Sequence, residues 1–441
     1  MKSLFNFCTR RYWHSALLAL GAALTLGSSP TSAADFSTTN TGALTHFWSA
    51  IESTNRPVTV VSFGDSMADS YRSPTYYLMN TLVARLGSAG YSLNNYRNTA
   101  LWNLVNGATN RLPDYFWFTG YLQIPAGGAI FWNNQQNAGG VLCDQVGIYY
   151  VSHTNGGQFR MLISTNGGPW TPALVLDGYN LSPQGHFTNV VVPLNRYRLR
   201  VEGDTGTNFI IGTSLVSANT NGVHAAFTDW GGIALSQVTN VPLAIRAPIF
   251  AALQPDLIIW HMKEPLNGLS NRMAACENWW RTSAPDCEVV YIGTPWLSAD
   301  TNTTTTIDQN TVVRAIALQH QRAYIDLMQP TISYNWLLTN GYMADGTHLN
   351  NSGGLHCANI MWDDLGFFAL GSNRRIALHQ AGNQLQLSYN TSVGARYRLE
   401  ASTNLQNWSV ILTNPVAITT FTTNFTAPPG PTYYRLGLTP P

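Results

Sequence analysis

The order of apolar and polar positions near residue 60 predicts a buried strand followed by a helix. Residues 57–63 (PVTVVSF) form an apolar run rich in β-branched side chains, and this run ends at Gly64-Asp65-Ser66. Apolar side chains then recur at helical spacing from Tyr76 to Leu86. A strand, a sharp turn and a helix in this order predict the start of a βαβ unit.

The same alternation of strands and helices returns in the second half of the chain. Strand patterns occur at 256–260, 288–292 and 324–327. Helical patterns occur at 308–321 and 353–368. Such alternation is typical of a parallel sheet with helices on both faces. We therefore predict a three-layer α/β/α domain, formed by the separate segments 40–110 and 218–370.

Two other regions consist of short alternating runs without a helical pattern. Between 111 and 217, clusters of Gly, Asn, Thr and Pro separate these runs at intervals typical of an antiparallel sandwich. Because the βαβ pattern resumes afterwards, we predict that 111–217 is an all-β sandwich inserted into the α/β domain. Residues 374–441 show similar runs and predict a small, separate C-terminal β-sandwich.

The N-terminus has the pattern of an export signal. A basic head that ends at Arg11 is followed by an apolar run at 16–26 and by small residues at 31–34 that offer an A-x-A-like cleavage site. The apolar run is too short for a spanning helix, although an N-terminal membrane anchor is the alternative. We expect residues 1–33 to be a signal peptide, which makes the protein secreted, periplasmic or cell-surface and leaves no membrane-spanning segment.

The composition excludes several classes of partner. Charged residues make up 10% of the 441 residues and the net charge is +1, whereas an average soluble domain is about 25% charged. Without a basic run, neither nucleic-acid binding nor polybasic membrane attachment is expected. Hydrophobic residues make up 45% of the chain, which excludes a disordered protein.

The cysteines permit disulfides and give no support to a metal site. Cys143, Cys276, Cys287 and Cys357 remain after the expected signal peptide. Cys276 and Cys287 enclose a short segment and are the first candidate pair, with two buried free thiols as the alternative. No Cys-x-x-Cys or His-Glu-x-x-His spacing occurs, so we predict neither a metal nor another cofactor.

Ser66 is the first residue that could carry chemistry. It follows a predicted parallel strand and precedes a helix, at the sheet edge where open α/β folds bind ligands. A helix N-terminus there supplies N–H groups to a developing oxyanion. A serine needs a base to act as a nucleophile, and the alternative is that Gly-Asp-Ser only turns the chain into the helix.

Asp345 and His348 are candidates for the missing base and its partner. They stand three residues apart in a glycine-containing loop before the last predicted helix. Such a loop can turn the carboxylate onto the imidazole, so that the other ring nitrogen faces Ser66. Alone, this spacing fits an ordinary turn with a capping aspartate; together with Ser66 it predicts nucleophilic acyl transfer.

These motifs resemble those of the SGNH (GDSL-type) hydrolases. The sequence VVSFGDS, which ends at Ser66, resembles the family's first block, and DGTH, from Asp345 to His348, resembles its last block. The resemblance covers about 57–108 and 220–370. It implies an SGNH-hydrolase fold and a catalytic triad of Ser66, His348 and Asp345, with the N–H of Ser66 in the oxyanion hole.

The two middle blocks of the family match less well. The second supplies a glycine N–H to the oxyanion hole; Gly232 in WGGIALSQ is the better match and Gly231 the alternative, while a close helix approach would also explain the pair. The third block carries an asparagine, but here the sequence WHMKEP places Lys263 or Pro265 at that position. Losing such a donor costs about 10²–10³ in rate. The third donor is therefore left open between Lys263, Asn267 and none.

Several other residues are expected to be structural. His261 and Glu264 follow the third-block strand and are predicted to fill satisfied structural roles. The aromatic run 115–118 and the pair Trp279-Trp280 are expected in the core, with stacking on sugar rings as the alternative. Six further histidines show no pairing pattern: His153, His186, His224, His320, His356 and His379.

The sequence as a whole predicts an exported serine esterase that removes short acyl groups, with O-acetyl as the expected group, from carbohydrate. The inserted region resembles sandwiches of polysaccharide-deacetylating SGNH hydrolases, which implies a part in glycan binding, and 374–441 resembles small fibronectin-like modules. A lipid esterase or lysophospholipase on the same triad is one alternative. A glycan-binding surface protein with a weakened catalytic site is the other. No oligomeric state is predicted.

Overall fold

The computed structural model divides by its contacts into Met1–Asp35 and Phe36–Pro441. It describes residues 38, 43–53, 56–68, 72–95, 102–111, 117, 120–132, 142–165, 168–217, 222–229, 231–298, 305–365, 377–381, 384–390, 397–403, 409–413, 420–426 and 433–438. The expected signal peptide, 1–33, lies outside the described residues, as do 115, 116 and 118 of the aromatic run and Trp230 of the second block.

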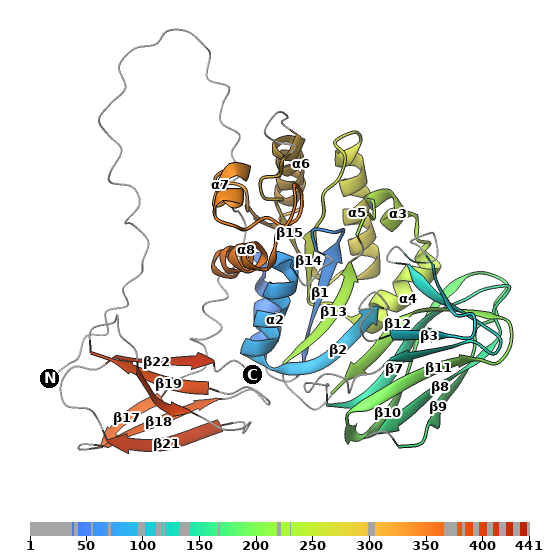
Figure 1. The fold of residues 1–441 in the computed structure, drawn as a ribbon, viewed down its shortest axis with the longest axis horizontal. Helices are drawn as coiled ribbons and strands as arrows, with labels where there is room; N and C mark the ends of the chain where they lie inside the picture. The colour runs from blue at the N-terminus through green and yellow to red at the C-terminus, as the bar shows by residue number, and fades with distance from the viewer. Residues whose placement is uncertain are drawn as a thin grey trace, which may run out of the picture. The chain divides into compact units, whose positions relative to one another are not determined.

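Six parallel strands form the centre of the molecule (Figure 1). Their spatial order is β2 (Ser88–Asn95), β13 (Val223–Asp229), β1 (Val58–Gly64), β14 (Leu257–His261), β15 (Glu288–Ile292) and β16 (Ala323–Ile325). All seven residues of β1 are buried, because a parallel sheet has helices on both faces. The parallel sheet predicted from the sequence is confirmed.

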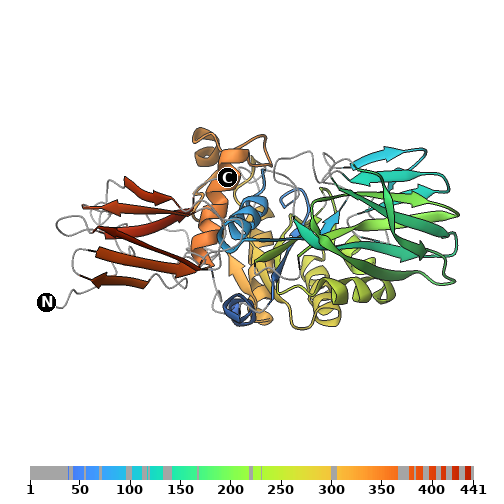
Figure 2. The same cartoon turned by 90° about the horizontal axis from the view of Figure 1, so that it is seen from below.

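Alternate residues of β1 face two separate hydrophobic cores. Val58 and Val60 belong to the core beneath one group of helices, whereas Val61 and Phe63 belong to the core beneath the other. The first group is α1 (Thr45–Ser53), α2 (Pro74–Leu86), α7 (Tyr334–Thr339) and α8 (Asn351–Asp364). The second is α3 (Leu235–Asn240), α4 (Leu243–Leu253), α5 (Leu269–Ser283) and α6 (Thr305–Gln319). Helices α2 and α8 lie side by side in both views (Figure 1, Figure 2).

The sheet continues beyond β2 into the region predicted as an insertion. Strand β12 (Thr207–Val216) pairs antiparallel with β2, and β7 (Cys143–Ser152), β10 (Gln184–Asn195), β5 (Tyr121–Pro125) and β4 (Thr109–Arg111) extend the sheet to 11 strands. This pairing satisfies backbone groups that the edge of β2 would otherwise leave open. Strands of the region predicted as an insertion and the six parallel strands therefore belong to one hydrogen-bonded sheet.

A second sheet completes this region. Its order is β3 (Trp102–Val105), β6 (Ala129–Trp132), β11 (Tyr197–Gly203), β8 (Gln158–Thr165) and β9 (Thr171–Asp177). A third hydrophobic core contains side chains from both sheets, such as Ile148 and Ile210 from one and Met161 and Val201 from the other. Strands of this region begin at 102, ahead of the expected start at 111.

The C-terminal region consists, in its described part, of two antiparallel three-stranded sheets. One has the order β17 (Ala377–Ala381), β18 (Gln384–Asn390) and β21 (Thr420–Thr426). The other has the order β20 (Ser409–Thr413), β19 (Tyr397–Ser402) and β22 (Tyr433–Leu438). The boundary at 374 and the sandwich arrangement stay predictions.

Several side chains for which the sequence left two roles open are buried in the structure. Trp117, Trp279 and Trp280 are at most 1% exposed and belong to the core, so they are not placed to stack on a sugar. Cys276 and Cys287 are buried and free, as are the other two described cysteines, which agrees with the free-thiol alternative. Among the described helices, none is long and apolar enough to cross a membrane.

The buried thiols give a first testable prediction. Burial raises the pKa of Cys143 and Cys357 to about 12 and raises the pKa of Cys276 and Cys287 as well. We expect none of these four thiols to react with a disulfide reagent in the folded protein, and all four to react after unfolding in urea. Reductant should leave the melting temperature unchanged; a lower melting temperature with reductant would reveal a stabilising disulfide.

Candidate active site

The carboxyl ends of three neighbouring parallel strands meet at one edge of the sheet. Gly64, the last residue of β1, pairs with Asp229 at the end of β13 and with His261 at the end of β14. Ser66 lies two residues beyond Gly64 and therefore emerges at this edge. Ligands bind at this edge in open α/β sheets.

The turn before Ser66 depends on a close approach between β1 and the end of β14. A Cβ atom on Gly64 would overlap the carbonyl oxygen of His261, so only glycine fits there. The next residue, Asp65, is 5% exposed. Its carboxylate accepts hydrogen bonds from the N–H of Met67 at 2.9 Å and of Lys263 at 3.1 Å. Burial nevertheless raises the pKa of Asp65 to about 6.

The structure brings together the three residues predicted as a triad. The Nε2 atom of His348 lies 3.1 Å from the hydroxyl oxygen of Ser66, and its Nδ1 atom lies 2.9 Å from a carboxylate oxygen of Asp345. An N–H on Nδ1 that faces the carboxylate leaves Nε2 free to accept a proton from the serine. The side chains of His348 and Asp345 are 42% and 57% exposed, so this arrangement opens to the surface.

Backbone hydrogen bonds keep Asp345 ionised. One oxygen of its carboxylate accepts the N–H groups of Thr347 and His348, each at 2.7 Å. These bonds, with that to the His348 ring, lower the pKa of Asp345 to about 2. A charged carboxylate next to the imidazole favours the imidazolium that forms when His348 accepts a proton.

The loop that carries Asp345 and His348 is tied at several points. The N–H of Ala344 donates to the carbonyl of His348 at 2.9 Å, and the N–H of Ser298 donates to the carbonyl of Gly346 at 2.8 Å. Directly after the loop, the side chain of Asn350 caps α8. The backbone on both sides of the His348 imidazole is therefore held in one position.

Gly232 lies in the turn between β13 and α3, beyond the same sheet edge. Its φ angle is +83°, in the region that favours glycine. A Cβ atom on Gly232 would meet no atom of the described residues within 4 Å, so close helix packing does not explain this glycine. Its role as an oxyanion donor stays a prediction.

The third-block candidates occupy different places. Lys263 is two residues beyond β14 and is bonded through its N–H to Asp65, directly before the serine. Pro265 and Asn267 are exposed, and the side chain of Arg272 donates to the carbonyl of each. The structure therefore bonds the backbone of Lys263 to the serine turn, whereas the bond of Asn267 joins its carbonyl to Arg272.

Glu264 has the structural partners that were expected, whereas His261 does not. Glu264 is buried, and its carboxylate accepts the N–H of Leu235 at 2.6 Å and lies 3.3 Å from Nε of Arg272. His261 is fully buried, but neither ring nitrogen has a hydrogen-bond partner in the described part of the chain. Burial lowers the pKa of His261 to about 3, so its ring is neutral.

Two residues at the site were not singled out from the sequence. Asp65 stands directly before Ser66 in the same motif, and this position is the sequence feature that could have identified it as a residue of the site. Arg72 lines the hollow beside Ser66 and His348, and its position before α2 carries no such signal. This hollow, completed by Met67, Ser73, Pro74 and Leu349, has a volume of about 10 Å³.

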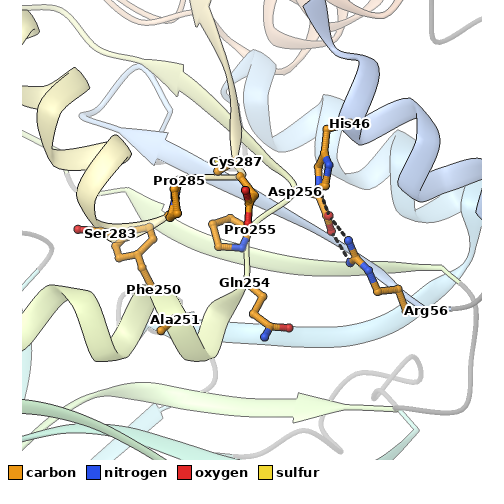
Figure 3. Close-up of a pocket in the computed structure, with 12 residues that line it drawn as sticks. His46, Arg56, Phe250, Ala251, Gln254, Pro255, Asp256, Ser283, Pro285 and Cys287 are labelled. Atoms are coloured by element: carbon orange, nitrogen blue, oxygen red, sulfur yellow. Dashed lines mark hydrogen bonds and ion pairs between the residues drawn. The ribbon is translucent and has the colours of Figure 1, made fainter.

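A larger cavity of about 370 Å³ lies at the opposite, amino-terminal edge of the sheet. Figure 3 shows Asp256, directly before β14, between Arg56 and His46, with which it forms ion pairs. None of the predicted catalytic residues lines this cavity. Among the described residues, no cluster of His, Cys, Asp or Glu could hold a metal ion.

Comparisons with known proteins identify the fold. No protein-family model and no curated protein matches the sequence. A solved peptidoglycan O-acetylesterase aligns over 76% of this chain and 98% of its own, with a TM-score of 0.57 and 16% identity. A family two carbohydrate esterase from Cellvibrio japonicus covers 60% of this chain and 99% of its own (TM-score 0.24, 10% identity). A lipase/acylhydrolase from Enterococcus faecalis covers 34% and 78% (TM-score 0.26, 13% identity). The fold assignment rests on the first of these three, whose TM-score exceeds 0.5.

The raised pKa of Asp65 predicts a pH-dependent stability difference between the wild type and Asp65→Asn. Ionising Asp65 costs free energy in the folded protein, so the wild type should lose stability relative to the variant as the pH rises from about 4 to about 6. A shift of about two pKa units corresponds to about 3 kcal/mol. Urea unfolding of both proteins measures this, because other titrations cancel in the difference. A constant difference across this range would show that Asp65 ionises normally.

Proposed function

We propose that this chain, which has the fold of the SGNH hydrolases, is a serine esterase that removes short acyl groups from carbohydrate. The proposal rests on two contacts at the carboxyl edge of the sheet. One joins the Ser66 hydroxyl to Nε2 of His348, and the other joins Nδ1 of His348 to the Asp345 carboxylate. A hydroxyl, an imidazole and a carboxylate in this order form the arrangement that activates a serine for acyl transfer.

In the proposed reaction, the hydroxyl oxygen of Ser66 attacks the ester carbonyl while Nε2 of His348 accepts its proton. The negative charge on the tetrahedral intermediate is held by the N–H groups of Ser66 and Gly232. His348 then gives the proton to the departing sugar oxygen, which breaks the ester bond and leaves an acyl-enzyme. Water attacks this acyl group, with His348 again accepting and returning the proton, and the free acid leaves. Asp345 stabilises the imidazolium in both halves.

The size and exposure of the site support a short acyl group on a large substrate. The hollow that the described residues form beside Ser66 is small, about 10 Å³, which supports a short acyl group over a fatty acyl chain. The exposed His348 and Asp345 place the reacting groups at the surface, where a polymer can reach them. The activity for which the peptidoglycan O-acetylesterase of similar fold is named also supports an acetylated carbohydrate.

The proposal extends to the remaining regions. We assign 1–33 to a signal peptide that exports the enzyme to its substrate, 111–217 to glycan contact and 374–441 to an accessory role. The second candidate function is a glycan-binding protein with little or no turnover. The departure from the third-block asparagine at Lys263 is the observation that favours it.

Hydrolysis of p-nitrophenyl acetate tests the nucleophile. We expect Ser66→Ala and His348→Ala each to lower kcat by about 10⁴-fold or more, since a triad acts as a unit. His320→Ala is the matched control, because His320 follows α6 and bonds to Arg281 away from the site. This control should keep wild-type activity. Equal activity of Ser66→Ala and the wild type would overturn the proposal, and glycan binding without turnover would favour the second function.

Acyl chain length separates the carbohydrate esterase from a lipid esterase. We expect kcat/KM to fall steadily from acetate through butyrate to octanoate esters, because the hollow that the described residues form at Ser66 is small. The same enzyme should release acetate from an acetylated polysaccharide, as measured by acetate assay with Ser66→Ala as background. Rising activity with chain length would instead support the lipid esterase alternative.

A further inference from the structure

Lysine is almost absent from this chain. Lys2 and Lys263 are the two lysines among 23 basic residues, and the other 21 are arginines. Because Lys2 lies in the expected signal peptide, Lys263 is the one lysine that the exported protein would keep. Arginine presents a rigid planar fork, whereas lysine presents a compact charge with three rotatable donors. The single position that carries this different cation lies beside Ser66.

Strand register places Lys263 next to the nucleophile. Gly64 at the end of β1 pairs with His261 at the end of β14. Ser66 and Lys263 each follow their strand's last residue by two positions. The two turns are joined directly, because the N–H of Lys263 donates to the carboxylate of Asp65 at 3.1 Å.

A residue of α6 is hydrogen-bonded to the backbone on both sides of Lys263. The side chain of Gln309 donates to the carbonyl of Met262 at 3.0 Å and accepts the N–H of Glu264 at 3.1 Å. Gln309 is buried, so water does not compete for these bonds. The backbone direction at Lys263 is therefore fixed, and only its flexible side chain is free to move.

Glu264, the residue after Lys263, also bonds to the segment that follows Gly232. The buried carboxylate of Glu264 accepts the N–H of Leu235 at 2.6 Å, three residues after Gly232. Arg272 of α5 lies 3.3 Å from this carboxylate and also donates to the carbonyl of Pro265. Glu264 thus holds the turn after β13 against the turn after β14, one on each side of Ser66.

The ammonium group of Lys263 is not engaged by a partner among the described residues. Its side chain is half-buried, and within the described part of the chain its Nζ atom makes no hydrogen bond or ion pair. A partly buried cation without a partner among the described residues, carried by a turn that is bonded to the turn of Ser66, is available to an anion that forms at that edge of the sheet. The oxyanion of the tetrahedral intermediate is such an anion.

We infer that the ammonium group of Lys263 is the third oxyanion donor, in the place where an asparagine amide would otherwise stand. This inference rests on the proposed function. As the bond from Ser66 to the carbonyl carbon forms, the carbonyl π electrons move onto oxygen. The ammonium then donates a charge-assisted hydrogen bond to that oxygen without giving up its proton. When the intermediate collapses, the carbonyl re-forms, the sugar oxygen leaves with the proton from His348, and Lys263 is unchanged.

Steady-state kinetics of Lys263→Met and Lys263→Asn test this role. Methionine matches the length of the lysine stem without its charge, and we expect its kcat on p-nitrophenyl acetate to fall about 10²–10³-fold. KM should change little, because the bond forms mainly in the transition state. Lys263→Asn supplies an amide N–H and should recover part of the lost kcat. Melting temperatures close to the wild-type value would separate this loss from a folding defect.

Chemical rescue gives a readout that a purely structural role would not move. In Lys263→Cys, alkylation with 2-bromoethylamine rebuilds an ammonium group at nearly the length of lysine. Cys143, Cys276, Cys287 and Cys357 are buried, so the new thiol is the accessible target among the described cysteines. We expect alkylation to raise the kcat of this variant by at least about tenfold and to leave wild-type protein, treated in parallel, unchanged.

The outcomes separate this inference from the proposed function. If Ser66-dependent turnover is present and Lys263→Met keeps full kcat, the inference falls and the esterase proposal stands. A low kcat in Lys263→Cys that alkylation does not restore also overturns the inference, since charge at that position is then insufficient. If wild-type protein shows no Ser66-dependent turnover, the proposed function and the inference fall together.

Discussion

The close contact between the end of β1 and the end of β14 is the constraint on which the candidate site depends. Gly64 allows the two backbones to approach where any side chain would overlap the carbonyl of His261. That approach brings the carboxylate of Asp65 within reach of the N–H of Lys263. The backbone turns that carry Ser66 and Lys263 are therefore held against each other at this edge of the sheet.

The buried polar groups behind the site extend this constraint. Asp65, Glu264 and Gln309 are each at most 5% exposed, and each accepts backbone N–H groups from the turns at the sheet edge. A buried polar group is costly unless it is hydrogen-bonded. Any displacement of these turns would leave such groups unpaired, so the network holds the turns in one arrangement. The loop with Asp345 and His348, in contrast, is held at the surface by bonds from its own backbone N–H groups to the Asp345 carboxylate.

The sequence predicts those parts of the fold that local patterns encode. Apolar runs such as 57–63 and 288–292 correspond to β1 and β15, and the spacing of Asp345 and His348 predicts their contact. Strand β13 lies next to β1, yet its sequence VHAAFTD lacks the apolar run that would predict a buried strand. Its small side chains Ala225 and Ala226 are buried in the two hydrophobic cores. Neither the pairing of β12 with β2 nor the place of Lys263 beside Ser66 follows from local pattern, since both depend on register between distant segments.

The hydrogen-bonded continuity from β10 to β16 determines whether the all-β region can be removed without damage to the parallel sheet. A domain joined only by a linker shares no sheet edge with its neighbour, so its removal leaves no strand unpaired. Here, removing the insertion would strip β12 from β2 and leave an open edge on the parallel sheet. The all-β region and the parallel sheet therefore form one hydrogen-bonded structural unit, rather than a host domain with a separable attachment.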